Sequence, residues 1–182
     1  MTHTTADVHN LERPWSLYAH GIADGNTYGN AYLKIAHIDT CEEWARVWNH
    51  CNVQHIGRTD VKINILGNQI TTWSLFQRDI HPEWEHKDNM GGITLSHRSY
   101  MTPAIASETW TSLVIECVRG ASPNAVLGIQ VSQRFGRTAA MMKYDVWLAS
   151  GARVVDVIQW LYDVTSQPFS IVPRAITTRS RR

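Results

Sequence analysis

Hydrophobic and polar positions alternate along much of the chain, which predicts a protein built mainly from β-strands. The pattern indicates strands at residues 14–20, 32–38, 71–80, 93–95, 126–133, 141–148 and 169–172. Residues 61–65 also alternate, which indicates either a small hairpin or an insert. Apolar residues recur at helical spacing in three further runs, at residues 40–50, 107–119 and 154–162. This order predicts an α+β fold in which three helices cover one face of an antiparallel sheet.

The predicted helices begin with capping signals. Asp39 or Thr40 can cap the first helix, and Ser107 is predicted to cap the second. In the third helix the spacing predicts a buried stripe, with Trp160 away from its centre. That stripe consists of Val154, Val157, Ile158, Leu161 and Tyr162.

Length and charge narrow the classes of function. With 182 residues, the chain is long enough for one domain with a substantial core. Seventeen basic and sixteen acidic residues give a net charge of +1. That balance argues against wrapping a long nucleic acid, but it permits a small pocket with a few basic residues. A core can absorb several of the eight tryptophans, and the excess favours an aromatic binding surface.

The three cysteines do not form a disulfide pattern, and the spacing of His50, Cys51 and His55 fits no strong zinc motif. We therefore expect no metal and no cofactor. The sequence shows no signal peptide and no apolar run of membrane-spanning length, which predicts a soluble, cytoplasmic protein without a membrane partner.

The ends of the chain are polar and lack periodicity. We expect a flexible N-terminus over residues 1–10, one domain over residues 11–173 and a flexible basic tail over residues 174–182. The tail concentrates four arginines, which could touch RNA phosphates.

The most informative chemistry lies in the predicted loop after residue 80, where Trp84 and Glu85 are adjacent. An indole face attracts a cation or a flat heterocycle. A carboxylate accepts two parallel hydrogen bonds, such as those offered by the Watson–Crick edge of guanine. The pair therefore suits a guanine that carries a positive charge from methylation at N7. The alternative is that Trp84 anchors the loop into the core and Glu85 is solvated.

The residues around this pair carry a resemblance. Ile-His-Pro-Glu-Trp-Glu at residues 80–85, followed by Asn-Met-Gly-Gly at residues 89–92, resembles the signature of the eukaryotic translation initiation factor 4E family. The resemblance extends over roughly residues 15–173. It implies a non-enzymatic protein that binds 7-methylguanosine caps, with a curved antiparallel sheet, three helices on its convex (dorsal) face and the cap site on its concave side.

The resemblance also implies roles for particular residues. Tyr28 stands where most members carry the first cap-stacking tryptophan, so Tyr28 and Trp84 would sandwich the base and Glu85 would read its edge. Arg134 aligns with a phosphate-binding residue, and Arg137 could supply a second after a one-residue deletion. The alternatives are an exposed loop tyrosine and a pair of solvated turn arginines.

Further positions near the implied cap site differ from the family pattern. Met141 or Met142 replaces a tryptophan that lies near the cap's methyl group in many members, and a thioether can still pack there. Lys143 is a weaker phosphate candidate. Ile93 stands where a basic residue often follows Gly-Gly.

The surface on which the family binds scaffold and repressor proteins is altered as well. Ala45 stands at the dorsal tryptophan that anchors partner helices, although an insertion would place Trp44 there instead. Cys41 and Thr111 each replace an aliphatic contact. Loss of a large aromatic anchor predicts that any scaffold or repressor is bound by an altered mode.

Three classes of function remain at this point. The first is a protein that binds capped mRNA or 7-methyl-GTP in translation initiation or its regulation, including a repressor that sequesters caps. The second is a protein-interaction module of the same fold that has lost cap binding. An enzyme has little support, because the sequence offers no nucleophile–base motif, phosphate-cradling glycine loop or paired catalytic carboxylates.

Overall fold

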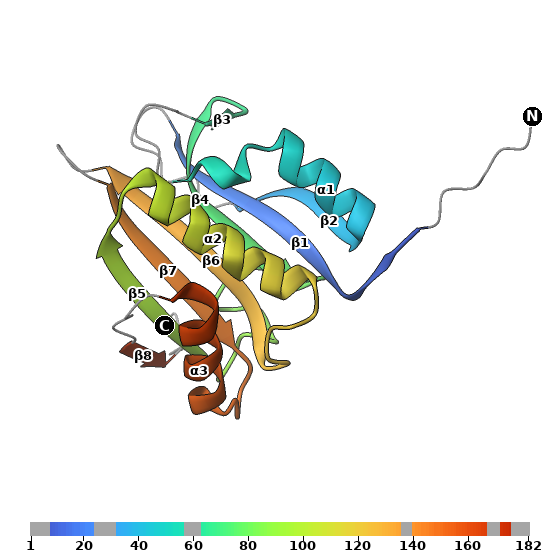
Figure 1. Ribbon diagram of the computed structural model, residues 1–182, viewed down its shortest axis with the longest axis vertical. Coiled ribbons are helices and arrows are strands. Elements are labelled where there is room, and N and C mark those ends of the chain that lie inside the picture. Colours follow the sequence, from blue (N-terminus) through green and yellow to red (C-terminus); the bar gives the residue numbers. More distant parts are fainter. Residues whose placement is uncertain (1–7, 24–31, 57–62, 136–139, 167–171, 176–182) are drawn as a thin grey trace, which may run out of the picture.

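The computed structural model describes residues 8–23, 32–56, 63–135, 140–166 and 172–175 (Figure 1). The strands are β1 (Asn10–Ala23), β2 (Leu33–Thr40), β3 (Asn64–Ile65), β4 (Asn68–Gln77), β5 (Ile93–Tyr100), β6 (Val126–Phe135), β7 (Ala140–Leu148) and β8 (Val172–Ala175). The helices are α1 (Cys41–His50), α2 (Pro103–Val118) and α3 (Val154–Thr165), with a short 3-10 turn η1 (Val53–His55).

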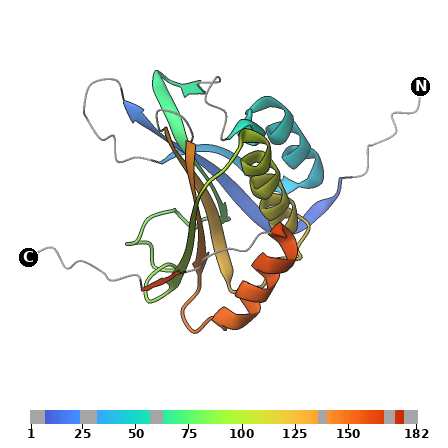
Figure 2. The ribbon, with the colours of Figure 1, turned by 60° about the vertical axis from the view of Figure 1, so that its left-hand side comes forward.

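Within these residues the strands form one antiparallel sheet in the order β2-β1-β4-β6-β7-β5-β8, and β3 adds to β4 as a small hairpin. All three helices lie on the same side of the sheet, as Figure 2 shows. The predicted α+β fold is therefore confirmed. We call the side under the helices the helix face, and the opposite side the open face.

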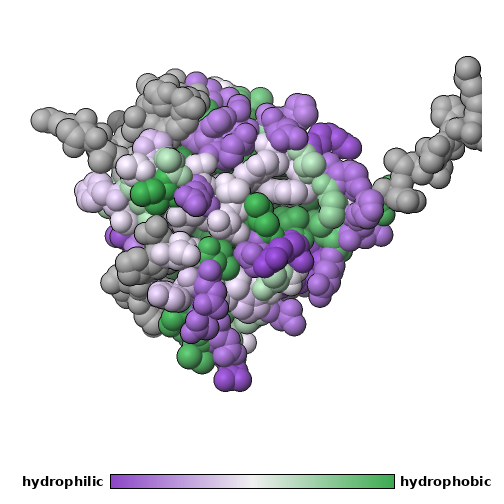
Figure 3. Space-filling view, in the orientation of Figure 1, coloured by the Kyte–Doolittle hydropathy of each residue, from purple (hydrophilic) through white to green (hydrophobic). Residues whose placement is uncertain are grey.

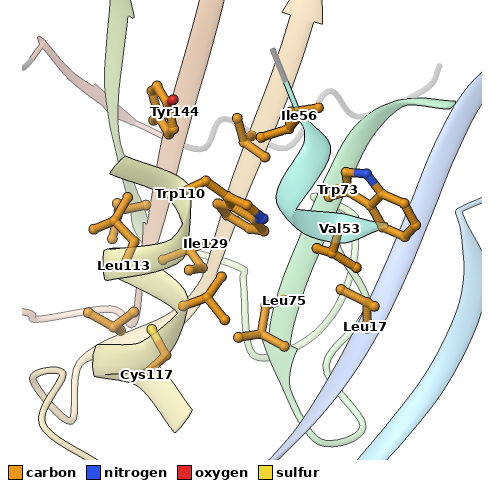
Figure 4. Close-up of a cluster of buried hydrophobic side chains, with 14 of the residues drawn as sticks. Leu17, Val53, Ile56, Trp73, Leu75, Trp110, Leu113, Cys117, Ile129 and Tyr144 are labelled. Atoms are coloured by element: carbon orange, nitrogen blue, oxygen red, sulfur yellow. The ribbon is translucent and has the colours of Figure 1, made fainter. Parts of the chain in front are cut away.

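The main core fills the space between the helices and the sheet. Trp15 of β1, Trp73 of β4 and Trp110 of α2 are fully buried there. Figure 4 shows Trp110 and Trp73 with apolar side chains from η1, α2 and the neighbouring strands. Burial of these large rings supplies much of the hydrophobic stabilisation of the fold.

A second, smaller cluster lies on the open face and consists of Tyr18, Phe76, Ile80, Leu127 and Trp147. The ring of Phe76 passes so close to Gly128 that any Cβ at residue 128 would collide with it. This cluster supports the beginning of the loop that follows β4.

The cap of the first helix is Thr40. Its hydroxyl accepts a hydrogen bond from the backbone N–H of Glu43 at 3.1 Å, and the Glu43 carboxylate accepts one from the backbone N–H of Thr40 at 3.2 Å. This reciprocal capping box settles the choice between Asp39 and Thr40 in favour of Thr40.

The prediction for the start of the second helix was wrong. The helix begins at Pro103 with Thr102 as its cap, because proline suits the first helical position and lacks an N–H that needs a partner. Ser107 lies inside the helix, where its hydroxyl donates to the backbone carbonyl of Gln54 at 2.5 Å.

The buried stripe of α3 was also predicted incorrectly. Trp160 is buried, whereas Ile158 and Tyr162 are exposed. The helix is rotated so that its largest apolar side chain packs inward, which removes more apolar area from water than the predicted orientation would.

Strand boundaries differ from the predictions mainly at β1, β5 and β8. Strand β1 runs from Asn10 to Ala23, beyond both ends of the predicted residues 14–20. Strand β5 continues to Tyr100, five residues beyond the predicted end at residue 95. Strand β8 includes Arg174 and Ala175, which the sequence assigned to the basic tail. Residues 1–7 and 176–182 lie outside the described part of the chain. No helix among the described residues is long and apolar enough to cross a membrane.

Candidate functional site

The loop between β4 and β5, residues 78–92, is held in place by Asn89. This side chain is fully buried, and its amide nitrogen donates to the backbone carbonyls of His81 and Glu83, each at 2.8 Å. The two bonds tie the end of the loop to its beginning. Trp84 and Glu85 lie between the bonded residues, so the backbone that carries this pair is fixed by a buried side chain.

Two further contacts attach the loop to the sheet. The Tyr18 hydroxyl of β1 donates to the carbonyl of Ile80 at 3.2 Å. At the other end of the loop, a Cβ on Gly92 would collide with the carbonyl oxygen of Leu148, so only glycine permits this close approach. The loop therefore contacts β1 at its beginning and β7 at its end.

Trp84 projects from this loop onto the open face. Its ring stacks on Trp147 of β7, with ring centroids 4.1 Å apart and planes inclined by 29°. Trp147 is buried, whereas Trp84 is 40% exposed. One face of the Trp84 indole is therefore covered by Trp147, and part of the ring is accessible to solvent.

A pocket of about 210 Å³ opens beside this pair of indoles. It combines aromatic, polar and cationic side chains from the loop and from several strands. Its lining consists of Tyr32, Trp84, Arg98, Gln130, Ser132, Arg134, Met141, Lys143, Asp145 and Trp147. We call this set the open-face pocket.

The strand register explains how these residues come together. In an antiparallel sheet, directly opposite residues project from the same face, and the next such row lies two residues along. Strands β5, β7 and β6 place Ser96, Asp145 and Gln130 in one row. The next row contains Arg98, Lys143 and Ser132, and the row after it contains Tyr100, Met141 and Arg134.

The three cationic groups of the pocket lie at least four residues along the register from Trp147. Arg98, Arg134 and Lys143 provide three cationic groups. Asp145 is a buried carboxylate, and its two oxygens accept hydrogen bonds from Ser96 Oγ and Lys143 Nζ, each at 2.5 Å. The carboxylate thus holds Lys143 along the sheet and offsets part of the positive charge.

Tyr32, the residue before β2, lines the same pocket. Gln130 Nε2 donates to its hydroxyl at 3.2 Å, and its ring lies 5.1 Å from that of His20. Burial raises the pKa of Tyr32 above its ordinary value. The group is therefore a neutral phenol at physiological pH and can both donate and accept hydrogen bonds.

The structure brings several of the predicted site residues into this pocket, namely Trp84, Arg134, Met141 and Lys143. Met142 is fully buried on the helix face, so Met141 is the methionine next to the site. Glu85 is exposed on the loop and is not among the described residues that line the pocket. Tyr28 and Arg137 lie outside the described residues.

Six lining residues were not among the predicted site residues, namely Tyr32, Arg98, Gln130, Ser132, Asp145 and Trp147. A signal existed for Trp147, because it alternates with Lys143 and Asp145 at the spacing of one strand face. No comparable signal existed for Arg98, because β5 was predicted to end before it.

The predicted partner surface lies on α1 and α2. Cys41 and Ala45 are exposed one turn apart, Thr111 is half-buried, and Trp44 stacks on Trp48 with ring centroids 4.8 Å apart. In Figure 3, which looks onto the helix face, hydrophobic residues lie in small areas separated by hydrophilic ones. Ala45, at the position predicted for a partner's anchor, offers only a methyl group on this surface.

The described residues contain no group of three or more His, Cys, Asp or Glu side chains placed to hold a metal ion. His50, Cys51 and His55 belong to this described part, and they form no such group.

Comparisons with known proteins agree with the fold. The model of the family described as eukaryotic initiation factor 4E matches residues 10–163. No individual curated protein matches the chain by sequence.

Solved structures show the same fold at low identity. A schistosome eIF4E in complex with m7GpppA and a 4E-BP is 17% identical, with a TM-score of 0.71 over 96% of this chain and 94% of that one. Ascaris suum eIF4E-3 with an m2,2,7G cap is 16% identical, with a TM-score of 0.72 over 97% and 96%.

C. elegans eIF4E-3 bound to the 4E-binding protein Mextli is 18% identical, with a TM-score of 0.70 over 93% of both chains. The family model covers most of the present chain, and the family's members are non-enzymatic cap-binding factors. This protein belongs to the eukaryotic initiation factor 4E family.

Proposed function

We propose that this protein binds the 7-methylguanosine cap of messenger RNA in the open-face pocket and acts in the cytoplasm, in translation initiation or its regulation. The observation that carries the proposal is that aromatic and cationic side chains occupy different parts of the pocket. Two indoles, those of Trp84 and Trp147, lie beside one part of it, and the side chains of Arg98, Arg134 and Lys143 lie along another. A cap has the same arrangement, a cationic base followed by a chain of phosphates.

The contact between the two indoles constrains where the base can lie. Stacked groups need about 3.5–4 Å between their atoms, so a ring inserted between two others requires about 7 Å. Trp84 and Trp147 are 4.1 Å apart, so in this arrangement a base stacks on the outer face of Trp84. Tyr28 would cover the other side of the base.

The positive charge of the methylated base is what selects it from other purines. A cation is attracted by the face of an indole, and more strongly than a neutral ring is. Glu85 would then accept the two N–H groups on the guanine edge. This contact requires the exposed carboxylate to turn toward the pocket when the base is bound.

The cationic side chains would hold the phosphates. Guanidinium groups bind phosphate oxygens through two parallel hydrogen bonds, and lysine adds a compact charge. The shared pocket of Arg134 and Lys143 supports this role for both, and Arg137 would add to them. Met141 is opposite Arg134 and two residues from Lys143 on the same face.

The protein partner is proposed to be engaged differently from the usual mode. Relatives of this fold have been solved with 4E-binding proteins. In this chain, Ala45 and Cys41 offer no aromatic anchor on the exposed side of α1. A protein that binds caps but holds scaffold proteins weakly would sequester messages, so the altered surface favours a regulatory role.

The guanine-reading role of Glu85 is tested with Glu85→Ala, and Glu83→Ala is the matched control because it removes an exposed carboxylate from the same loop. Calorimetric affinities for 7-methyl-GTP and ATP give the base discrimination. Loss of the charge-assisted pair is expected to reduce that discrimination by about tenfold or more. Glu83→Ala should leave it unchanged. If Glu85→Ala and Glu83→Ala discriminate equally between 7-methyl-GTP and ATP, Glu85 does not read the guanine edge.

A further inference from the structure

An exposed aromatic side chain ends the strand that borders the open-face pocket. Tyr100 is the last residue of β5 and is 71% exposed. It is opposite Met141 of β7, which is in turn opposite Arg134 of β6. Both of these neighbours line the pocket.

The register places the Tyr100 side chain on the pocket's face. Residues directly opposite one another in antiparallel strands project from the same side of the sheet. Arg98, two residues before Tyr100, lines the pocket, and side chains of one strand share a face at this spacing. Tyr100 therefore lies just beyond the row of Arg98 and Lys143, about 7 Å farther along the sheet.

The chemical groups follow a definite order along this face. Trp147, on which the base-binding Trp84 stacks, comes first, and Arg98 with Lys143 lies four residues farther along the register. Tyr100, Met141 and Arg134 follow as the next row. The order is thus an aromatic surface, then cations, then a second aromatic surface.

A capped RNA presents its groups in the matching order. The methylated base is followed by the phosphate bridge, and the bridge by the first nucleoside of the RNA chain. An aromatic ring can stack on any base, because every base has a π-face, and a nearby arginine adds a cation–π contribution. A phenol that is exposed next to an arginine and a thioether suits this contact.

We propose that Tyr100, supported by Met141 and Arg134, is a stacking platform for the first nucleoside after the phosphate bridge. This inference rests on the proposed function. It assigns Arg98 as well, because its register position lies between those of Trp147 and Tyr100, where its guanidinium would hold the bridge. The consequence is that the protein binds a dinucleotide cap more tightly than a cap without a second nucleoside.

The experiment compares the affinities of 7-methyl-GTP and m7GpppA by calorimetry for the unmodified protein, Tyr100→Ala and Tyr100→Phe. The unmodified protein should bind m7GpppA about tenfold more tightly, which corresponds to one stacked base. Tyr100→Ala should lose this gain and keep its affinity for 7-methyl-GTP. Tyr100→Phe should retain the gain, because the ring remains.

Tyr162→Ala is the matched control, since Tyr162 is 61% exposed on α3 and lies on the helix side of the molecule. It should change neither affinity. The inference is overturned if m7GpppA binds no more tightly than 7-methyl-GTP, or if Tyr100→Ala preserves the difference. If neither ligand binds the unmodified protein, it is the proposed function itself that fails.

Discussion

The two faces of the sheet differ in what their side chains do, and strand β7 shows the difference residue by residue. Met142, Tyr144 and Val146 are buried on the helix face, where the Tyr144 hydroxyl donates to the carbonyl of Ala106 at 3.0 Å. The alternate residues, Met141, Lys143, Asp145 and Trp147, line the open-face pocket. One set of alternate side chains of β7 therefore contributes to the core, and the other set contributes to the site.

This separation has a practical consequence. Substitutions on the helix face should lower the free energy of unfolding and leave the affinity of the folded protein intact. Substitutions of exposed side chains on the open face should do the reverse. Variants at Trp110, Trp84 and Ala45 test this separation, and their expected effects decrease in that order.

The largest effect is expected at Trp110, the fully buried tryptophan of α2. Trp110→Ala leaves a cavity in the main core and should lower the free energy of unfolding by about 3–5 kcal/mol, measured by urea denaturation. If Trp110→Ala does not fold, Trp110→Phe provides a smaller loss. The folded fraction should bind 7-methyl-GTP with unchanged affinity. A parallel loss of affinity would show that the faces are not separable.

The opposite result is expected at Trp84. Because its ring is 40% exposed, Trp84→Ala should change the free energy of unfolding by less than the core variant does. Affinity for 7-methyl-GTP should fall by about 1–3 kcal/mol, the contribution of one stacked base, as measured by calorimetry. An unchanged affinity would mean that Trp84 only covers Trp147.

The smallest effect on stability is expected on the exposed side of α1. Ala45→Trp should leave the free energy of unfolding within about 0.5 kcal/mol, because the site is solvent-exposed. It should increase affinity for a helical peptide of the kind that the family's scaffold and repressor proteins present, since aromatic anchors dominate such interfaces. Arg46→Trp, which points elsewhere on the same helix, is the control. Equal gains in both variants would contradict a specific anchor position.

The sequence predicted the fold well because alternation reports directly on which residues share a face. The loop from residue 80 to residue 92 was also identified correctly, since its proline, asparagine and glycines have local structural causes. Asn89 bonds two carbonyls of its own loop, and Gly92 is required by close contact with Leu148.

The sequence predicted less of the pocket, because its lining depends on which distant residues become opposite one another. Arg98 and Lys143 are 45 residues apart, and only the pairing of β5 with β7 makes them neighbours. Trp84 and Trp147 are 63 residues apart, and they meet only because the loop after β4 lies against β7. The buried stripe of α3 was mistaken for a related reason, because two neighbouring faces of that helix are both apolar and packing selects one.

The central claim is that a methylated, positively charged guanine is bound on Trp84. The most direct measurement is a titration of the purified protein with 7-methyl-GTP and with GTP, followed by tryptophan fluorescence. We predict quenching by both nucleotides at saturation, with a clear preference for 7-methyl-GTP, because the methyl group supplies the charge that the indole face attracts. Equal weak binding of the two nucleotides, or no binding, would contradict the account and would identify a family member that has kept the fold without the cap site.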